Sequence, residues 1–525
     1  MKIFSRPIVT ASVFSPLIAF WLTLGIGSSV ATHAADRPPN VVVIMADDLG
    51  YGDVSCYGST AIETPNIDAL ADDGLRFTSG YCSASTCTPT RYSFLTGQYA
   101  FRTPGTGIAP PNSPAIIAAG TPTIASSLRD AGYRTAVIGK WHLGLGESSG
   151  PDWNGTLKPG PLDIGFDECL LLPTTNDRVP QVYVRNDRVE NLDPDDPIWV
   201  GRKKPSPDHP TGLTHRGTLK MDWSHGHNQT IHNGISRIGF YTGGNDARFR
   251  DEDLADRWVD ESVRFINAHK DEPFFLFFAS HDIHVPRMPH ERYQSKSTLG
   301  WRGDAILELD DSVGRLMAAI NAAGIDDHTM VVFCSDNGPV LDDGYQDDAI
   351  EKNGDHRPAG PFRGGKYSIY EGGTRTPFIV RMPGRVAPGV SDSIVCTVDL
   401  FRSVATVAGA DVPEGAAGDS VDVSAALLGD ASGIDGGRGH LVVQDNGRSG
   451  DYGLRQGKWK LQKHASGKAR NIKVNAPLAT TPVPTFRLFD LENDPKETKD
   501  VSQEHPEVFE TMKQLLNQVV AKPTG

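Results

Sequence analysis

The sequence predicts an α/β fold built around a large, mostly parallel sheet with helices on both faces. Four apolar runs of strand length each end abruptly at polar residues, at 41–45, 135–138, 274–278 and 330–333. Continuous apolar runs of this length are typical of strands that are buried on both faces. Helical patterns lie between them, at 67–75, 123–131, 255–269 and 305–322. This alternation of strand and helix is typical of one sheet sandwiched between two layers of helices.

Each of the four apolar runs leads directly into a pair of polar residues. In chain order the pairs are Asp47 and Asp48, Lys140 and His142, His281 and His284, and Asp336 and Asn337. In open α/β sheets, ligands bind beyond the carboxyl ends of the strands. Because all four pairs follow strand ends, we expect them to meet at one shared site.

The remaining segments predict insertions and a second, smaller unit. Loop-rich sequence from 144 to 253, dense in Pro, Gly, Asp and Asn, predicts insertions above the sheet rather than a separate domain. A helix is expected at 399–410, and the Gly- and Ala-rich stretch 415–437 predicts a linker. The apolar runs and final helix predict a small C-terminal α+β subdomain, with runs at 441–444, 453–461 and 486–491 and a helix at 506–519. We therefore expect a catalytic domain at 36–430 and a subdomain at 437–525.

The start of the chain has the three parts of a secretory signal peptide. Lys2 and Arg6 give a charged start, an apolar stretch follows at 16–30, and small residues at 32–35 offer a cleavage site. A membrane anchor is the alternative, but this stretch is short and interrupted by Gly and Pro. We expect a signal peptide at 1–35, a mature chain without a membrane span, and a periplasmic or extracellular location.

Composition, net charge and cysteine content limit the kinds of protein that the chain can be. With 525 residues and 38% hydrophobic content, the chain can bury a large core. Its net charge of −14 argues against nucleic acid as a partner, and a polyanionic substrate would need a local basic cluster. The six cysteines show no metal-ligand spacing such as C-x-x-C, and a disulfide among them is possible but cannot be inferred from the sequence. A small disulfide loop with Cys82 is nevertheless the structural alternative for Cys87.

The segment from residue 87 to residue 97 carries the most specific motif. It reads CTPTR at 87–91 and LTG at 95–97. Pro89 suits the first turn of a helix and Gly97 its end, so Cys87 is expected at a helix start. Free backbone N–H groups and the helix dipole favour a bound sulfate there. The segment resembles the C-x-P-x-R-x-x-x-L-T-G signature of the type I, formylglycine-dependent sulfatases, with Thr90 where that family usually has Ser.

This resemblance covers the chain from 39 to about 500. Within the family, the chain resembles bacterial carbohydrate sulfatases, arylsulfatase A and N-acetylgalactosamine-6-sulfatase-like enzymes. The resemblance implies an alkaline-phosphatase-like sandwich with a smaller C-terminal α+β subdomain. It also implies that a maturation enzyme converts Cys87 to formylglycine (3-oxoalanine). The hydrated aldehyde carries two hydroxyls on one carbon, of which one attacks sulfur and the other later expels sulfate.

The resemblance also implies a metal site. Asp47, Asp48, Asp336 and Asn337 match the four protein ligands of the family, and residue 87 completes the set. All of these groups offer oxygen, which selects one Ca²⁺ ion, with Mg²⁺ as the alternative. A purely structural role at strand ends is the other interpretation, because Asp-Asn-Gly alone would be a turn signal.

The resemblance gives catalytic roles to five further residues, Arg91, Lys140, His142, His284 and Lys366. Lys140 would contact the sulfate, and His142 would act as the base during sulfate expulsion. His284 and Lys366 match residues that hold the bridging oxygen, and one of them should protonate the leaving alcohol. Arg91 would order residue 87 and the metal-bound acids.

Two polar insertions, at 174–180 and 224–229, bear on the substrate. They contain Asp177, Arg178 and His227. An aryl sulfate would call for an apolar slot, whereas a sugar calls for groups that bind its hydroxyls. These loops resemble those of bacterial carbohydrate sulfatases that act on 6-sulfated galactose or N-acetylgalactosamine. The resemblance implies that the three residues bind the sugar, including its axial hydroxyl at carbon four; the alternative is a surface ion pair and a loop spacer.

The sequence therefore predicts a hydrolase of sulfate monoesters that acts on the 6-O-sulfate of a sulfated glycan. One alternative is a phosphoester or phosphonate hydrolase of the same superfamily. A single set of oxygen ligands flanked by Lys140 and Lys366 favours sulfate over that alternative. The other is a non-catalytic sulfoglycan-binding protein in which Cys87 stays unmodified, and the intact site residues argue against it.

Overall fold

The computed structural model describes residues 37–433, 436–446, 450–465, 467 and 482–522. The chain divides into Met1–Arg37 and the compact unit Pro38–Gly525, and the second unit carries the elements described below. The expected signal peptide at 1–35 lies outside the described residues. Among the described residues, no helix combines the length and the apolar character that a membrane crossing requires.

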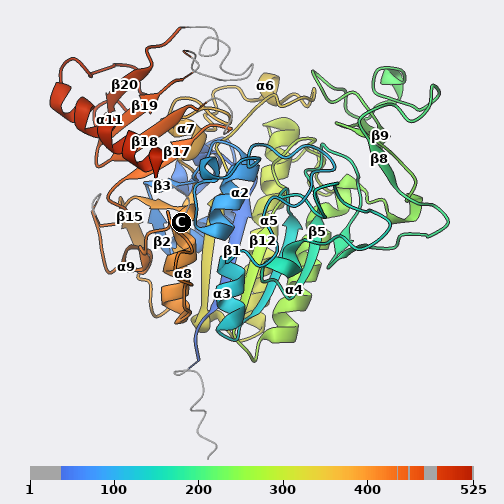
Figure 1. Ribbon diagram of the computed structural model, residues 1–525, viewed down its shortest axis with the longest axis horizontal. Coiled ribbons are helices and arrows are strands. Elements are labelled where there is room, and N and C mark those ends of the chain that lie inside the picture. Colours follow the sequence, from blue (N-terminus) through green and yellow to red (C-terminus); the bar gives the residue numbers. More distant parts are fainter. Residues whose placement is uncertain (1–36, 434–435, 447–449, 466, 468–481, 523–525) are drawn as a thin grey trace, which may run out of the picture. The chain divides into compact units, whose positions relative to one another are not determined.

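A ten-stranded sheet, counted over the described residues, lies at the centre of this unit, in the order β15-β2-β14-β13-β1-β12-β4-β5-β6-β7 (Figure 1). The four strands predicted from the apolar runs are β1 (Asn40–Ala46), β4 (Arg134–Lys140), β12 (Phe274–Ala279) and β13 (Thr329–Ser335). They are neighbours in the sheet and run parallel to one another. The predicted parallel core of the sheet is confirmed.

The register of these strands brings their carboxyl ends to one edge. Met45 of β1 is level with Ala279 of β12 and Cys334 of β13. Ala279 is in turn level with Gly139 of β4. The polar residues that follow the four strands therefore start from nearly the same height, which is the arrangement that a shared site requires.

Helices cover both faces of the sheet, as predicted. Alternate residues of β1, Val41, Val43 and Met45, pack into one core, whose helices are α2 (Cys87–Thr96), α3 (Ile124–Asp130) and α8 (Leu400–Ala408). The intervening residues pack into the other core, whose helices are α1 (Pro65–Asp72), α4 (Leu254–His269) and α5 (Gly300–Ala322). Because side chains of a strand alternate between faces, both faces of β1 need apolar side chains, and residues 41–46 supply them. Figure 1 shows α2 and α3 on the near side of the central strands.

Strands at both flanks extend the parallel centre. On one side β14 (Phe378–Arg381) runs antiparallel to β13 and to β2 (Leu75–Phe77), and β15 (Gly389–Ser391) pairs with β2 in parallel. On the other side β5 (Glu168–Leu172) runs parallel to β4, and β6 (Val184–Arg185) and β7 (Arg188–Val189) follow in antiparallel order. The loop-rich segment 144–253 was predicted to form insertions above the sheet, and this was wrong for β5, whose apolar residues are buried in the sheet itself.

The rest of that insertion folds into short paired strands. β8 (Trp199–Gly201) pairs with β11 (Phe240–Thr242), and β9 (Ile231–His232) forms a hairpin with β10 (Ile235–Ser236). Other short elements lie elsewhere in the unit: β3 (Gly80–Tyr81), β16 (Val395–Cys396), α6 (Ala349–Lys352), α7 (Glu371–Thr374) and α9 (Ser424–Leu427). Ala426 and Leu427 of α9 are buried in the main core, so the segment predicted as a linker packs onto the domain.

A four-stranded antiparallel sheet forms the C-terminal part of the chain. Its strands are β17 (Leu441–Gln444), β18 (Tyr452–Gln456), β19 (Trp459–Lys463) and β20 (Phe486–Asp490), and α11 (Pro506–Ala521) packs against them. The predicted α+β character is confirmed. The apolar run 453–461, however, is two strands, because the chain turns at Gly457, which has a φ of 54°.

Candidate active site

The carboxyl edge of the central strands gathers the four predicted metal ligands. Asp47 and Asp48 follow β1, and Asp336 and Asn337 follow β13. Asn337 Nδ2 donates to Asp48 Oδ1 at 2.7 Å, and the backbone N–H of Asp48 donates to Asp336 Oδ1 at 3.3 Å. All four residues are completely buried. Asp48 has a φ of 60°, a left-handed conformation that short polar residues tolerate better than most.

Two cations neutralise the acids on the β13 side of this cluster. Lys140 Nζ donates to Asp47 and lies 3.8 Å from Asp336 Oδ2. Arg91 of α2 donates through Nε to Asp336 Oδ2 at 2.9 Å and through Nη1 to the Lys140 carbonyl at 2.9 Å. Buried charges persist only when they are paired in this way. Arg91 thus ties the helix that starts at Cys87 to the ends of β4 and β13.

A third cation, Lys366, lies on the other side of the cluster. Its Nζ donates to Asp48 Oδ2 at 2.8 Å and to Asp343 Oδ2 at 2.8 Å. Burial acts to lower the pKa of Lys366, but Asp343 and Asp48 hold it well above its ordinary value. Lys366 therefore carries a proton at neutral pH.

The cluster retains oxygen atoms that suit a hard cation. Asp47 Oδ1 and Asn337 Oδ1 are buried without a hydrogen-bond partner. Burial, reinforced by Asp336, raises the pKa of Asp47 well above its ordinary value, although Lys140 opposes this. The ligand atoms of Asp47, Asp48 and His284 lie within 4.8 Å of one another. Unpaired buried oxygens of this kind fit Ca²⁺ or Mg²⁺. Asp336 differs from Asp47 and Asn337, because both of its carboxylate oxygens already accept hydrogen bonds.

Cys87 is the first residue of α2, as predicted, and Gly97 ends that helix in a left-handed conformation. The side chain of Cys87 is 2% exposed, and its Sγ lies 3.1 Å from His142 Nδ1. Burial raises the pKa of the thiol, although Lys140 and Lys366 oppose this, so the unmodified side chain is neutral at neutral pH and a weak nucleophile. All six cysteines are free thiols, which rules out the disulfide with Cys82.

His142 directs a lone pair at residue 87. Its Nε2 lies 3.0 Å from the carbonyl oxygen of Ala109, which can only accept a hydrogen bond. Nε2 therefore carries the proton, and Nδ1 faces Cys87 unprotonated. Burial, together with Arg178 and Lys140, holds the pKa of His142 well below its ordinary value. The ring is thus a neutral base at neutral pH.

His284 has the opposite arrangement of ring nitrogens. Its Nδ1 donates to the Val285 carbonyl at 2.7 Å, which leaves Nε2 without a proton in the neutral ring. Burial, with Lys366 and Lys140 nearby, holds the pKa of His284 well below its ordinary value. Of the two residues predicted to hold the bridging oxygen, Lys366 is therefore the one that carries a transferable proton.

The structure also brings the three predicted sugar-binding residues together. Asp177 Oδ2 lies 2.9 Å from His227 Nε2, and Arg178 Nη1 donates to Asp177 Oδ1 at 2.8 Å and to Thr175 Oγ1 at 2.7 Å. Burial alone would raise the pKa of Asp177, but Arg178 and His227 hold it well below its ordinary value. Because Asp177 and His227 are buried, the cluster is not a surface ion pair with a loop spacer.

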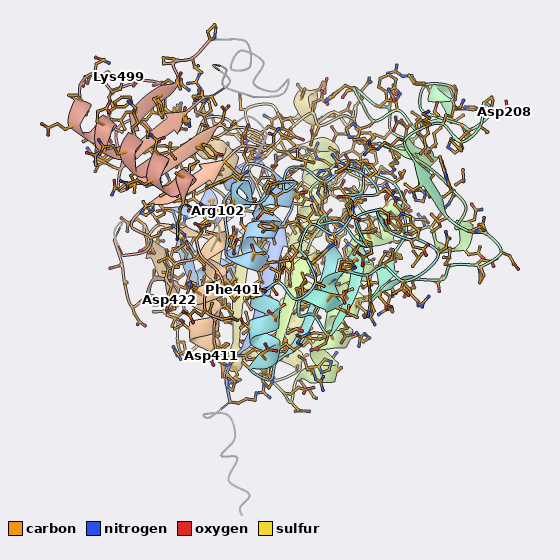
Figure 2. All side chains as sticks on the ribbon, in the orientation of Figure 1. Arg102, Asp208, Phe401, Asp411, Asp422 and Lys499 are labelled. Atoms are coloured by element: carbon orange, nitrogen blue, oxygen red, sulfur yellow. The ribbon has the colours of Figure 1, made fainter. Side chains whose placement is uncertain are left out.

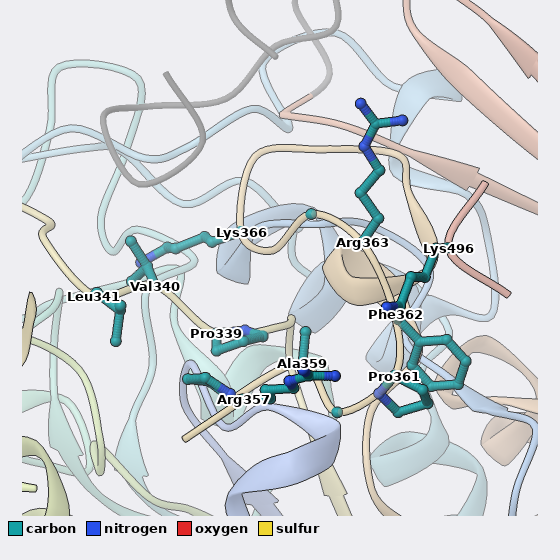
Figure 3. Close-up of a pocket in the computed structure, with 13 residues that line it drawn as sticks. Pro339, Val340, Leu341, Arg357, Ala359, Pro361, Phe362, Arg363, Lys366 and Lys496 are labelled. Atoms are coloured by element: carbon teal, nitrogen blue, oxygen red, sulfur yellow. The ribbon is translucent and has the colours of Figure 1, made fainter. Parts of the chain in front are cut away.

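A pocket of about 280 Å³ lies beside Arg178 of this cluster and is lined by Arg178, Ala109 and Asn446 among others. Ala109 is the residue whose carbonyl oxygen holds His142, so the lining of this pocket is in contact with the proposed base. A different pocket, of about 320 Å³, is lined by Lys366 together with Arg357, Arg363 and Lys496 (Figure 3). Each pocket is lined by one predicted site residue, and we favour the pocket beside Arg178 for the substrate because Arg178 is a predicted sugar-binding residue.

Sequence reasoning missed two residues of the site, Asp343 and Tyr367. Tyr367 Oη donates to Asp343 Oδ1 at 3.0 Å, and Asp343 in turn holds Lys366. Asp343 stands in the run Leu341-Asp342-Asp343-Gly344, which as sequence is a plain turn signal. No spacing in the chain connects it with Lys366, so no sequence signal could have found it.

Comparisons with known proteins agree with this geometry. The family model described as Sulfatase matches residues 39–410. The N-acetylgalactosamine-6-O-sulfatase of Bacteroides thetaiotaomicron is 45% identical over 483 residues, covering 92% of this chain and 93% of that protein. Human arylsulfatase A is 32% identical over 508 residues, covering 94% of this chain and 89% of that protein.

Solved structures support the same assignment. A structure described under the metabolism of multiple glycosaminoglycans by Bacteroides thetaiotaomicron matches with a TM-score of 0.88 and 44% identity, covering 93% of this chain and 100% of that one. A phosphonate monoester hydrolase of Agrobacterium radiobacter matches with a TM-score of 0.56 at 18% identity, covering 92% and 95%, which shows a shared fold alone. The predicted alkaline-phosphatase-like sandwich is confirmed, and the chain belongs to the sulfatase family of sulfuric ester hydrolases.

Proposed function

We propose that this sulfatase removes the 6-O-sulfate of galactose or N-acetylgalactosamine in a sulfated glycan. The observation that carries the proposal is the cluster of Asp177, Arg178 and His227 beside residue 87. It offers hydrogen-bond donors and acceptors to sugar hydroxyls, where an aryl sulfate would need an apolar slot. The Bacteroides relative named for N-acetylgalactosamine-6-O-sulfate hydrolysis, which matches nearly the whole chain, supports it.

The proposed reaction requires two groups that the chain would acquire. We propose that a maturation enzyme converts Cys87 to formylglycine and that Asp47, Asp48, Asp336 and Asn337, with residue 87, bind Ca²⁺. When bound, these groups would supply a hydroxyl for attack on sulfur and positive charge to hold the sulfate and lower the pKa of that hydroxyl.

The residues of the chain itself would position the ester and move protons. Lys140 would contact the sulfate from the β4 side. Lys366 would hold the bridging oxygen with His284 and donate its proton as the sulfur–oxygen bond breaks, because the neutral ring of His284 has none to give at Nε2. His142, with its Nδ1 lone pair 3.1 Å from residue 87, would accept a proton from that residue as sulfate leaves.

The substrate assignment is tested by comparing wild-type enzyme with Arg178→Ala. We expect kcat/KM on a 6-sulfated galacto sugar to fall about tenfold or more, equivalent to about 1.4 kcal/mol, with little change on a small aryl sulfate. The aryl sulfate is the control, since it reports the chemical step without the sugar contacts. Equal loss on both substrates, or a wild type that prefers the gluco epimer, would refute the assignment.

Maturation and location need separate measurements. The mass of the peptide that contains Cys87 should be about 18 daltons below that of the cysteine form, whereas ordinary oxidation adds mass. We further propose export to the periplasm or outside the cell after removal of residues 1–35. N-terminal sequencing of the protein from a cell fraction checks this, and a protein that keeps its first residues in the cytoplasm would contradict it.

A further inference from the structure

A second pocket adjoins the one that lies beside Arg178. Its volume is about 460 Å³, and Arg202 and Gln229 belong to its lining. The two pockets share three lining residues, Pro110, Pro111 and Ile238. The two pockets are therefore neighbours, and these three shared residues form a short ridge between them.

The ridge is part of the same backbone unit as the proposed sugar-binding cluster. Arg178 and Ile238 form a parallel β-bridge, in which the Ile238 N–H donates to the Asp177 carbonyl at 2.8 Å. The Val179 N–H donates to the Ile238 carbonyl at 3.2 Å. The position of the second pocket relative to Asp177 and Arg178 is thus fixed by main-chain hydrogen bonds.

Glycine keeps the ridge thin. Gly239, which follows Ile238, has a φ of 102°, and an added Cβ would lie 2.5 Å from Val179 Cγ2 and 3.4 Å from the Pro111 ring. A larger residue would therefore push the two segments apart.

The second pocket offers hydrogen-bond donors. Trp153 Nε1 donates to Asn112 Oδ1 at 2.7 Å, and the Gly239 N–H donates to Gln229 Oε1. Each amide therefore keeps its NH₂ group for another acceptor. Arg202 is the one charged residue in the lining, which contains no carboxylate.

The positive charge of Arg202 is reinforced by its two neighbours in the sequence. Arg202, Lys203 and Lys204 are consecutive and exposed. Neither Arg202 nor Lys203 forms an ion pair with any residue that the structure describes. In a chain with a net charge of −14, a pocket with an arginine and no acid is suited to an anion. A guanidinium binds carboxylate and sulfate groups through paired hydrogen bonds.

We infer that this pocket is a second sugar subsite, which binds the anionic sugar linked to the one that loses its sulfate. The inference rests on the proposed function and narrows its substrate class to acidic oligosaccharides. The anion is the carboxylate of a uronic acid or a second sulfate, because both present acceptor oxygens to Arg202. A neutral neighbouring sugar would leave the arginine without a partner.

The test compares four substrates that all carry 6-sulfated N-acetylgalactosamine. One is the free sugar, and in the others it is linked to a neutral hexose, a uronic acid or a sulfated hexose. For wild-type enzyme, we expect kcat/KM on at least one acidic disaccharide to exceed that on the neutral one by about tenfold. In Arg202→Ala this advantage should vanish, while turnover of the free sugar stays within about twofold of wild type. The two acidic arms distinguish carboxylate from sulfate.

Two further variants make the result specific. Arg202→Lys keeps the charge but not the paired geometry, so it should retain part of the advantage. Lys499→Ala is the control and also removes one exposed cation. Figure 2 shows Lys499 on the opposite side of the view from Asp208, and Asp208 is six residues after Arg202 in the sequence. That control should behave as wild type on all four substrates.

The outcomes separate the two proposals. If no 6-sulfated sugar is turned over, the proposed function fails. If the free sugar is turned over but acidic and neutral disaccharides are equivalent, the subsite fails alone. A loss in Arg202→Ala that is equal on all four substrates, or matched by Lys499→Ala, would also overturn the subsite, because it would reflect a general charge effect.

Discussion

Single atoms decide the chemistry that residue 87 can perform. Cys87 at the start of α2 is buried against a neutral imidazole, and its thiol is protonated at neutral pH. A protonated thiol is a weak nucleophile, so unmodified Cys87 is poorly suited to attack a sulfate ester even though a base lies beside it. This mismatch is what conversion of Cys87 to formylglycine would resolve.

We predict that Cys87→Ser and Cys87→Ala abolish sulfatase turnover while leaving the fold intact. Serine has no second hydroxyl with which to expel sulfate, and alanine has no nucleophile, so the loss should reach about three orders of magnitude or more. Turnover of a sulfate ester and thermal unfolding are the measurements. Cys56→Ser serves as the matched control, because Cys56 is partly exposed and remote in sequence from the motif. Residual activity above about one per cent in either Cys87 variant would contradict the mechanism.

At the residue level, the sequence was informative where a residue stands in a motif. Cys87, His142 and Asp336 come from short runs with recognisable spacing, and the structure places them together. Asp343 and Tyr367 do not, because their importance arises from contact with Lys366 across a turn. Such contacts depend on the path of a loop, which no local pattern encodes.

At the level of elements, strand ends explain how distant pairs meet. β1 and β13 were predictable because strands buried on both faces contain nearly continuous apolar runs. Since their parallel register is nearly even, the polar residues after them necessarily share an edge. β5 was missed because its five residues lie inside a long segment rich in Pro, Gly and Asp, whose composition dominates any local signal.

We predict that prolonged chelation removes activity and that Ca²⁺ restores it, with Mg²⁺ less effective. Without a cation, Asp47 Oδ1 and Asn337 Oδ1 stay buried and unpaired, so the apo enzyme should also unfold at a lower temperature. Activity and thermal unfolding are measured together on the chelated and reloaded enzyme. The double variant Asp47→Ala and Asp336→Ala should be inactive and should not respond to Ca²⁺.

Asp208→Ala is the control for that experiment, because Asp208 is an exposed acid outside the site. It should respond to chelation and to Ca²⁺ as wild type does. Restoration of the chelated wild type by Zn²⁺ alone would favour the phosphatase-like alternative, whose metal sites use nitrogen ligands.

At the scale of the whole molecule, a buried charge network joins the C-terminal sheet to the catalytic core. Lys460 of β19 donates to Glu371 Oε1 of α7 at 2.7 Å, and the Glu371 N–H donates to Glu497 Oε2 at 2.7 Å. Gln462 Nε2 donates to the other oxygen of Glu497 at 2.7 Å. The sequence predicted both parts but not this connection, because Glu371 is 89 residues from Lys460 and 126 residues from Glu497.

Glu497 makes this junction sensitive to pH. Burial raises the pKa of Glu497 to about 7, an effect that Lys460 opposes and Glu371 reinforces. In the unfolded chain the carboxyl has an ordinary pKa near 4.5. Between these values the folded protein binds a proton that the unfolded chain releases. The stabilisation is therefore complete below pH 4.5 and is lost as pH rises through about 7.

We predict that Glu497→Gln flattens the pH dependence of stability between pH 4.5 and 8, since glutamine does not titrate. The measurement is the midpoint of thermal unfolding at fixed ionic strength, recorded for both proteins across that range. The wild-type midpoint relative to that of the variant should decline with rising pH, most steeply between pH 4.5 and 7, and should level off above pH 7. The variant is expected to lose some stability at every pH, because the amide NH₂ group faces a donor that the carboxylate accepted. This loss does not affect the comparison, which concerns how the difference between the two midpoints changes with pH. A difference that stays constant, or that grows with pH, would show that Glu497 is ionised throughout and that the junction does not titrate.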